Sequence, residues 1–162
     1  MKKTWSIIVL VLILALGSSF LFGNKILFPL KYKDYIQKYS AEYKIDANIL
    51  AAVINKESGF RDFKYEQGEK NGLGQFKDES ALAIAKKMDL KDFKPETLTD
   101  AETSIKITAW YLADNRGNSI DDMIKAWVNR NNGNPSEEYI EFYRKDLMKA
   151  KGWYKVFHPS IK

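Results

Sequence analysis

The first 23 residues constrain the fold of this chain most strongly, because they contain a long uncharged apolar run. Residues 5–23 are nineteen consecutive residues without a charge, mostly Ile, Val, Leu and Phe, and they follow a short tail that carries Lys2 and Lys3. A helix of this length spans about 28 Å, which is close to the thickness of the hydrocarbon core of a bilayer. The run therefore predicts a single-pass membrane anchor.

Two alternatives to an anchor are compatible with the same residues. Ala15-Leu16-Gly17 has small residues at the spacing that a signal peptidase recognises, so a cleaved signal peptide and a secreted product remain open. A buried core helix is the other alternative. We favour the anchor because the apolar run continues past this motif through residues 20–22. More lysines follow the run than precede it, but a short basic tail normally stays inside, so we expect residues 24–162 outside the cytoplasm.

The rest of the chain predicts one all-α domain. A length of 162 residues corresponds to about one domain, and residues beyond Pro29 show helical periodicity without sustained strand-like alternation. We divide the chain into the anchor at 1–23, a linker at 24–34 and a domain at 35–158. Residues 119–122 form a Ser-x-x-Asp capping box. Six helices are expected. The first covers 32–43, the second lies between a cap at Asp46 and a stop at Gly59, and the third covers 79–88. The fourth begins near 100, the fifth at 119, and the last runs from 135 to Gly152. Only residues 63–76 suggest a weak β element.

Composition excludes several kinds of chemistry. The chain has no cysteine and one histidine, His158, so disulfides, thiolate nucleophiles, a Ser-His-Asp triad and a multi-His metal cluster are not expected. Residues 24–162 carry 24 Lys and Arg against 21 Asp and Glu, a net charge of +3 without a basic stripe, which argues against a nucleic-acid partner. We therefore expect no cofactor and no metal, and chemistry from carboxylates, amides and aromatic rings.

Glu57 is the strongest candidate for a catalytic residue. It follows Leu50 by seven residues, Val53 by four and Ile54 by three, so the helical period places its carboxyl group on the apolar face. Burial favours the protonated form that a general acid needs. Four of the nine glycines follow within residues 59–74, where they allow the backbone to approach a ligand closely. The alternative is a half-exposed residue at a helix end.

The motifs around Glu57 resemble those of a known family. Glu57-Ser58-Gly59-Phe60, followed by Gly72-Leu73-Gly74-Gln75, resembles the paired signature of the lytic transglycosylase domain of the lysozyme superfamily, Glu-Ser and then Gly-Leu-Met-Gln. Further blocks at 51–54, 98–105, 109–112 and 126–127 look like those of the family, in the same order, and residues 28–32 resemble the start of membrane-anchored members from Gram-positive bacteria. The resemblance covers nearly the whole chain and implies a lysozyme-like (goose-type/transglycosylase) all-α fold.

The resemblance also implies a reaction. Members of the family cleave the β-1,4 bond between N-acetylmuramic acid and N-acetylglucosamine in peptidoglycan without water, and leave a 1,6-anhydromuramyl end. It implies that Glu57 first gives a proton to the leaving glycosidic oxygen and then takes the proton of the muramyl C6 hydroxyl. It also implies that Gln75 lines the saccharide groove. Ser58 matches the motif serine, and we expect it to steady the helix end. Gln75 has an alternative role as a loop amide that satisfies only the backbone.

Four positions depart from the family pattern or are matched less directly. Gly74 replaces the motif methionine and removes a side chain from the groove wall. Glu66 replaces a serine found in many members; it is either a solvated loop charge or a second carboxylate that would make the enzyme a hydrolytic lysozyme. Trp127 takes the place of a tyrosine, and Tyr139 is the match for a tyrosine that usually faces the site. Trp127 and Tyr139 are candidates for stacking on sugar faces, with core packing as the alternative.

A non-catalytic role is a further alternative. The departures are also compatible with a degenerate domain that binds glycan strands or organises a wall-spanning complex without cleaving. In either case the expected partners are peptidoglycan strands and, through the N-terminal helix, the membrane. We expect the chain to be a monomer.

Overall fold

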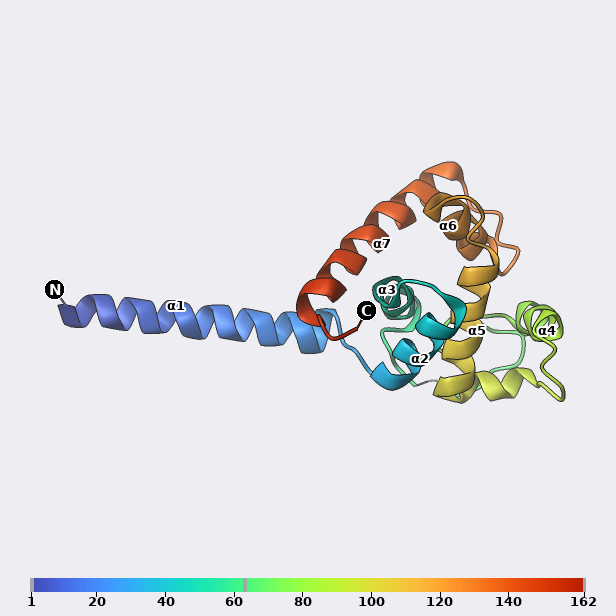
Figure 1. The fold of residues 1–162 in the computed structure, drawn as a ribbon, viewed down its shortest axis with the longest axis horizontal. Helices are drawn as coiled ribbons and strands as arrows, with labels where there is room; N and C mark the ends of the chain where they lie inside the picture. The colour runs from blue at the N-terminus through green and yellow to red at the C-terminus, as the bar shows by residue number, and fades with distance from the viewer. Residues whose placement is uncertain (1, 63, 162) are drawn as a thin grey trace.

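The structure is a computed structural model that describes residues 2–62 and 64–161, without the side chains of several residues near the N-terminus. The first helix, α1 (Lys2–Phe22), projects away from the rest of the molecule and continues into a short π-helix, η1 (Gly23–Leu27) (Figure 1). The apolar side chains described in α1, including Trp5 and Leu10, are largely exposed.

The remaining helices form one body (Figure 1). They are α2 (Lys33–Tyr43), α3 (Ala47–Ser58), α4 (Asp78–Lys87), the 3-10 helix η2 (Pro95–Thr99), α5 (Ala101–Asp114), α6 (Ile120–Asn129) and α7 (Glu137–Phe157). In the described residues the β structure is limited to one antiparallel bridge between Asn71 and Phe76. The weak β element expected at 63–76 is thus a single bridge, and Phe63 lies outside the described residues. The all-α prediction is confirmed.

Helix α3 lies at the centre of the body. It contacts α2, α5 and α7, and all its residues from Ala47 to Ile54 are buried. The Asp46 side chain accepts a hydrogen bond from the backbone N–H of Asn48, and Gly59 ends the helix with φ +60°. Both signals were predicted from the sequence, since a short carboxylate satisfies a free N–H at the start and glycine adopts the left-handed conformation at the end without strain. They fix where Glu57 lies on the helix.

Other helix starts also follow local signals. Asp100, Ser119 and Ser136 each accept a backbone hydrogen bond in the first turn of α5, α6 and α7. The capping box at 119–122 is only half formed, because the Asp122 carboxylate accepts from the backbone N–H of Asn118.

The predicted end of the last helix at Gly152 is wrong. Helix α7 continues to Phe157, because residues beyond the glycine pack against Phe28 and Pro29, in the segment that was predicted as a linker. Tyr154 is fully buried and donates a hydrogen bond to the carbonyl of Pro29 at 2.7 Å, and Phe28 stacks on Trp153 and Phe157. Burial of Tyr154 and stacking of the other rings outweigh the cost of one glycine inside a helix, which is about 1 kcal/mol.

The structure does not show the predicted transmembrane helix. In the described part of the chain, none of the helices combines the length and the apolarity that a membrane crossing requires. The side chains of Ala15 and Leu16, on which the signal-peptidase motif depends, lie outside the described residues.

Candidate active site

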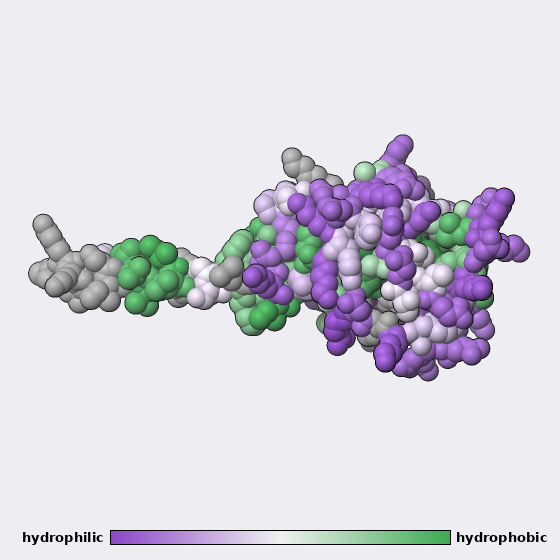
Figure 2. All heavy atoms as spheres, turned by 90° about the horizontal axis from the view of Figure 1, so that it is seen from below, coloured by the Kyte–Doolittle hydropathy of each residue, from purple (hydrophilic) through white to green (hydrophobic). Residues whose placement is uncertain are grey.

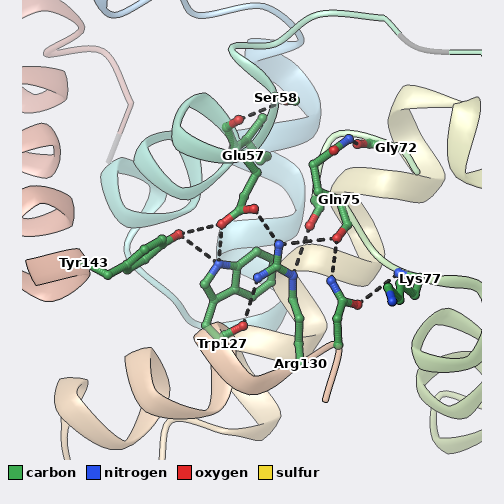
Figure 3. Close-up of polar contacts among 11 residues, drawn as sticks. Glu57, Ser58, Gly72, Gln75, Lys77, Trp127, Arg130 and Tyr143 are labelled. Carbon is green, nitrogen blue, oxygen red and sulfur yellow. Dashed lines mark hydrogen bonds and ion pairs between the residues drawn. The ribbon is translucent and has the colours of Figure 1, made fainter. Parts of the chain in front are cut away.

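Glu57 lies in the last turn of α3, and its side chain is 13% exposed. Three donors converge on its carboxylate (Figure 3). Oε1 accepts from Trp127 Nε1–H at 3.1 Å and from the Tyr143 hydroxyl at 2.8 Å, and Oε2 accepts from Arg130 Nη2 at 2.5 Å. The predicted place of Glu57 on the inner face of the helix agrees with the structure, and both oxygens of its largely buried carboxylate accept hydrogen bonds.

Trp127, from α6, positions Glu57 and has no face available for a sugar. Its ring is fully buried and packs edge-on against Phe76 and Tyr111, at centroid distances of 5.4 and 5.9 Å. Its indole N–H points to Glu57 and also donates to the Tyr143 hydroxyl at 2.9 Å. The expected stacking of Trp127 on a sugar face is therefore wrong, because a buried ring cannot meet the substrate.

Helix α7 contributes two tyrosines with different roles. Tyr143 is 6% exposed, and burial together with the negative charge of Glu57 raises the pKa of its hydroxyl well above 10. Tyr143 therefore remains a neutral donor to Glu57 across the physiological range. Tyr139 lies one turn earlier, is 51% exposed and lines the cavity beside Glu57. This exposure leaves Tyr139 able to contact a ligand.

Arg130 follows α6 and is 5% exposed. Its guanidinium donates to the carbonyls of Gly74 at 3.2 Å, Trp127 at 3.0 Å and Gln75 at 3.3 Å, and lies 4.0 Å from the centroid of the Trp127 ring. Arg130 was not among the predicted site residues. Its position three residues after Trp127 was the one signal in the sequence that could have indicated it.

The glycine-rich loop, residues 59–77 between α3 and α4, brings backbone carbonyls to Arg130. Gly72 has φ +71°, and a Cβ on it would overlap the Leu98 carbonyl and the Ser104 hydroxyl. Gly74 has no room for a Cβ either, because the Thr108 hydroxyl and the Phe76 ring occupy that space. The departure at Gly74 therefore belongs to a closely packed loop and does more than remove a side chain from the groove wall.

The remaining predicted site residues, Gln75, Ser58 and Glu66, lie at three different places around Glu57 or away from it. Gln75 uses its side-chain amide to donate to the Gly72 carbonyl at 2.8 Å, while its own carbonyl faces Arg130 (Figure 3). Ser58 is buried and donates to the Ile54 carbonyl at 2.9 Å, which agrees with the expected role at the helix end. Glu66 is exposed on the loop, and its backbone N–H donates to Asn71. The structure does not bring Glu66 to the cavity.

A cavity of about 290 Å³ opens beside the Glu57 carboxylate. It is lined by Glu57, Lys70, Lys77, Val128, Arg130, Asn131, Gly133, Pro135, Tyr139 and Tyr143. Glu57 is the one carboxylate among these lining residues, so the cavity is polar and positively charged around a single acid. Larger cavities of about 320 and 390 Å³ lie elsewhere, near Asp46 and beside η1, and neither is lined by Glu57. In the described residues, no cluster of His, Asp or Glu is arranged to hold a metal ion.

Fold and site together define an all-helical domain built around one buried glutamate next to a polar cavity. Residues 34–148 match the family model of the Transglycosylase SLT domain, and the chain belongs to this family. The predicted family membership is confirmed.

Solved structures of a lytic transglycosylase share this fold. The 70 kDa soluble lytic transglycosylase SLT70 from Escherichia coli matches with a TM-score of 0.68 and 22% identity, over 80% of this chain and 25% of that chain. The complex of the 70-kDa soluble lytic transglycosylase with bulgecin A matches with a TM-score of 0.67 and 23% identity over the same shares. This chain thus spans about a quarter of the length of those proteins. No curated protein matches it in sequence.

Proposed function

We propose that this chain is a peptidoglycan lytic transglycosylase. The observation that carries the proposal is the buried Glu57, held by Trp127 and Tyr143 at the wall of a cavity that belongs to a transglycosylase-family domain. Membership of the family and the likeness to a structure named as a lytic transglycosylase support the same reaction.

The reaction needs one group that donates and then accepts a proton. Protonated Glu57 donates to the glycosidic oxygen between N-acetylmuramic acid and N-acetylglucosamine as the bond from that oxygen to C1 breaks. The carboxylate then accepts the proton of the muramyl C6 hydroxyl as its oxygen bonds to C1, which closes a 1,6-anhydro ring and restores protonated Glu57. The nucleophile belongs to the substrate, so attack is intramolecular and is favoured by effective molarity.

The lining of the cavity supports a non-hydrolytic outcome. Hydrolysis through an activated water uses a second carboxylate across the sugar ring. Glu57 is the one carboxylate among the residues that line the cavity, and Glu66 is exposed on the loop outside this lining. A cleft with one acid suits a substrate that supplies its own hydroxyl.

Digestion of purified peptidoglycan by the full-length chain in mild detergent tests the proposal, with mass spectrometry of the released fragments. We expect 1,6-anhydromuramyl ends from the wild type and at least about a 10³-fold loss of rate in Glu57→Gln, since one residue performs both proton transfers. Reducing muramic acid ends would assign the chain as a hydrolase instead. Binding to peptidoglycan without cleavage would support the scaffold alternative and refute the enzyme.

We also propose that residues 1–23 attach the domain to the cell membrane, with residues 24–162 on the extracytoplasmic side. The nineteen uncharged residues of the run and the exposed apolar side chains of α1 support this placement (Figure 2). The test is fractionation of cells that express the full chain or a variant with Leu10, Leu12 and Leu14 replaced by Asp. The proposal expects the full chain in the membrane fraction and the variant outside it; equal distribution of the two would refute it. The monomeric state stays a prediction.

A further inference from the structure

The ion pair between Glu57 and Arg130 is the most buried one in the described part of the chain. The two side chains are 13% and 5% exposed, whereas in every other ion pair at least one partner is more than a third exposed. A nearby cation favours the charged form of a carboxyl group, and burial favours the neutral form. The surroundings of Glu57 combine both features, little exposure to solvent and an adjacent cation.

Arg130 is held in place independently of Glu57. Carbonyls of Gly74, Trp127 and Gln75 accept hydrogen bonds from its guanidinium, and the Trp127 ring packs against its face. These contacts do not depend on the charge of the glutamate. The cation therefore remains beside Glu57 when the carboxyl group gains or loses its proton.

The other charged and titratable groups near Glu57 do not replace Arg130. Lys56, next to Glu57 in the sequence, lies over the Tyr143 ring at 4.7 Å and pairs with Asp146 of α7. Tyr143 is a neutral hydrogen-bond donor. Lys70 and Lys77, from the glycine-rich loop, line the cavity as exposed cations. Arg130 is the one cation in this set that is bonded to the Glu57 carboxylate.

We propose that Arg130 is a positioning residue that offsets the burial of Glu57, so that one carboxyl group can serve in both protonation states. The inference rests on the proposed transglycosylase reaction, which needs Glu57 first as an acid and then as a base. Without Arg130, the carboxylate that accepts the C6 hydroxyl proton would lose the one cation bonded to it and would be harder to form in this buried place. The guanidinium also fixes Oε2, while Trp127 and Tyr143 fix Oε1.

The pH dependence of cleavage by full-length variants tests this role. In Arg130→Met the alkaline limb of the kcat/KM profile should move to higher pH by about one unit or more, the size expected for loss of an adjacent cation. In the same variant kcat should fall, since the base step is impaired. Arg130→Lys retains the charge, so its alkaline limb should stay near that of the wild type, although loss of the planar fork lowers kcat. An unchanged limb in Arg130→Met would overturn the proposal.

Arg144→Met is the matched control. Arg144 pairs with Glu141 on the outer part of α7, and its side chain is 35% exposed. Its pH profile should superimpose on that of the wild type. A shift equal to that of Arg130→Met would mean that the loss of any arginine has this effect, and would overturn a specific role.

A direct measurement separates this inference from the reaction itself. Carbon-13 NMR of glutamate-labelled full chain reports the Glu57 carboxyl signal, which is assigned from its loss in Glu57→Gln. The midpoint of the pH dependence of this signal should lie at higher pH in Arg130→Met than in the wild type. An equal midpoint in the two folded proteins, verified by their circular dichroism, would refute the role of Arg130 even if the chain cleaves peptidoglycan. A shifted midpoint in a chain without cleavage would leave the electrostatic role standing and remove the proposed function.

Discussion

The buried residues Glu57 and Arg130 should be strongly coupled, and a double-mutant cycle measures the coupling free energy. The perturbations are Glu57→Gln, Arg130→Met and the double variant, each in the full chain. Glutamine preserves the shape but offers one acceptor oxygen and an NH₂ group with two donors where three donors now converge. Whichever way the amide turns, at least one donor of the protein faces an N–H group or loses its partner.

The magnitude follows from the burial of the pair. Two unit charges about 4 Å apart attract by about 4 kcal/mol at an effective dielectric constant of about 20. Removing one partner of a buried pair typically destabilises by about 3–5 kcal/mol, because the other charge is left uncompensated. Since Arg130 retains its backbone carbonyl partners, we expect a coupling free energy of about 2–4 kcal/mol, with the double variant more stable than the sum of the single losses predicts.

The assay is denaturant unfolding followed by circular dichroism of the helices, at neutral pH and low salt. The exposed pair Lys125–Glu137, with an N–O distance of 2.8 Å, is the control and should show no measurable coupling. A coupling below about 1 kcal/mol for Glu57 and Arg130 would place the pair in the range of solvent-screened pairs and refute the reasoning from burial.

Two further predictions concern stability. Gly74→Ala should lower the free energy of unfolding by about 1–3 kcal/mol, because its Cβ would overlap packed neighbours. Gly152→Ala, inside α7 with open space around it, should raise the free energy of unfolding by about 0.5–1 kcal/mol. Denaturant unfolding that ranks the two variants in the opposite order would contradict the packing. Burial raises the pKa of Asp46, but hydrogen bonds from Lys151 and Asn48 outweigh it and leave the pKa below 3.8. A lowered carboxyl pKa gives stability that is present above the unfolded pKa and is lost as the pH falls through the lower folded pKa. The wild type should therefore lose more stability than Asp46→Asn between about pH 5 and 3, measured by thermal unfolding; parallel curves would exclude this contribution.

Much of the helical architecture could be predicted because its signals are local. Asp46 and Gly59 bound α3 through contacts within a few residues, and the apolar period within the helix places Glu57 on the inner face. The end of α7 could not be predicted in this way. Its last turn is stabilised by Tyr154, whose partner Pro29 is 125 residues away, and no helical period carries that information.

The site was only partly predictable for the same reason. Tyr143 has the helical spacing of a core residue, and spacing alone does not say that its hydroxyl reaches Glu57, 86 residues away. Trp127 was correctly placed near the site, but its burial excludes the role in stacking. Arg130 reaches Glu57 across 73 residues and the loop carbonyls across 55 and 56.

The sequence by itself determined the family, the helical class and Glu57 as the candidate acid, because short motifs and helical periodicity act over a few neighbouring residues. The tertiary structure alone decided what surrounds that carboxyl group. Whether Glu57 meets a cation, a neutral hydroxyl or solvent depends on how α3, α6 and α7 pack and on which way their side chains point. Burial and charge at Glu57 are properties of that packing, and they determine whether one carboxyl group can serve as both acid and base.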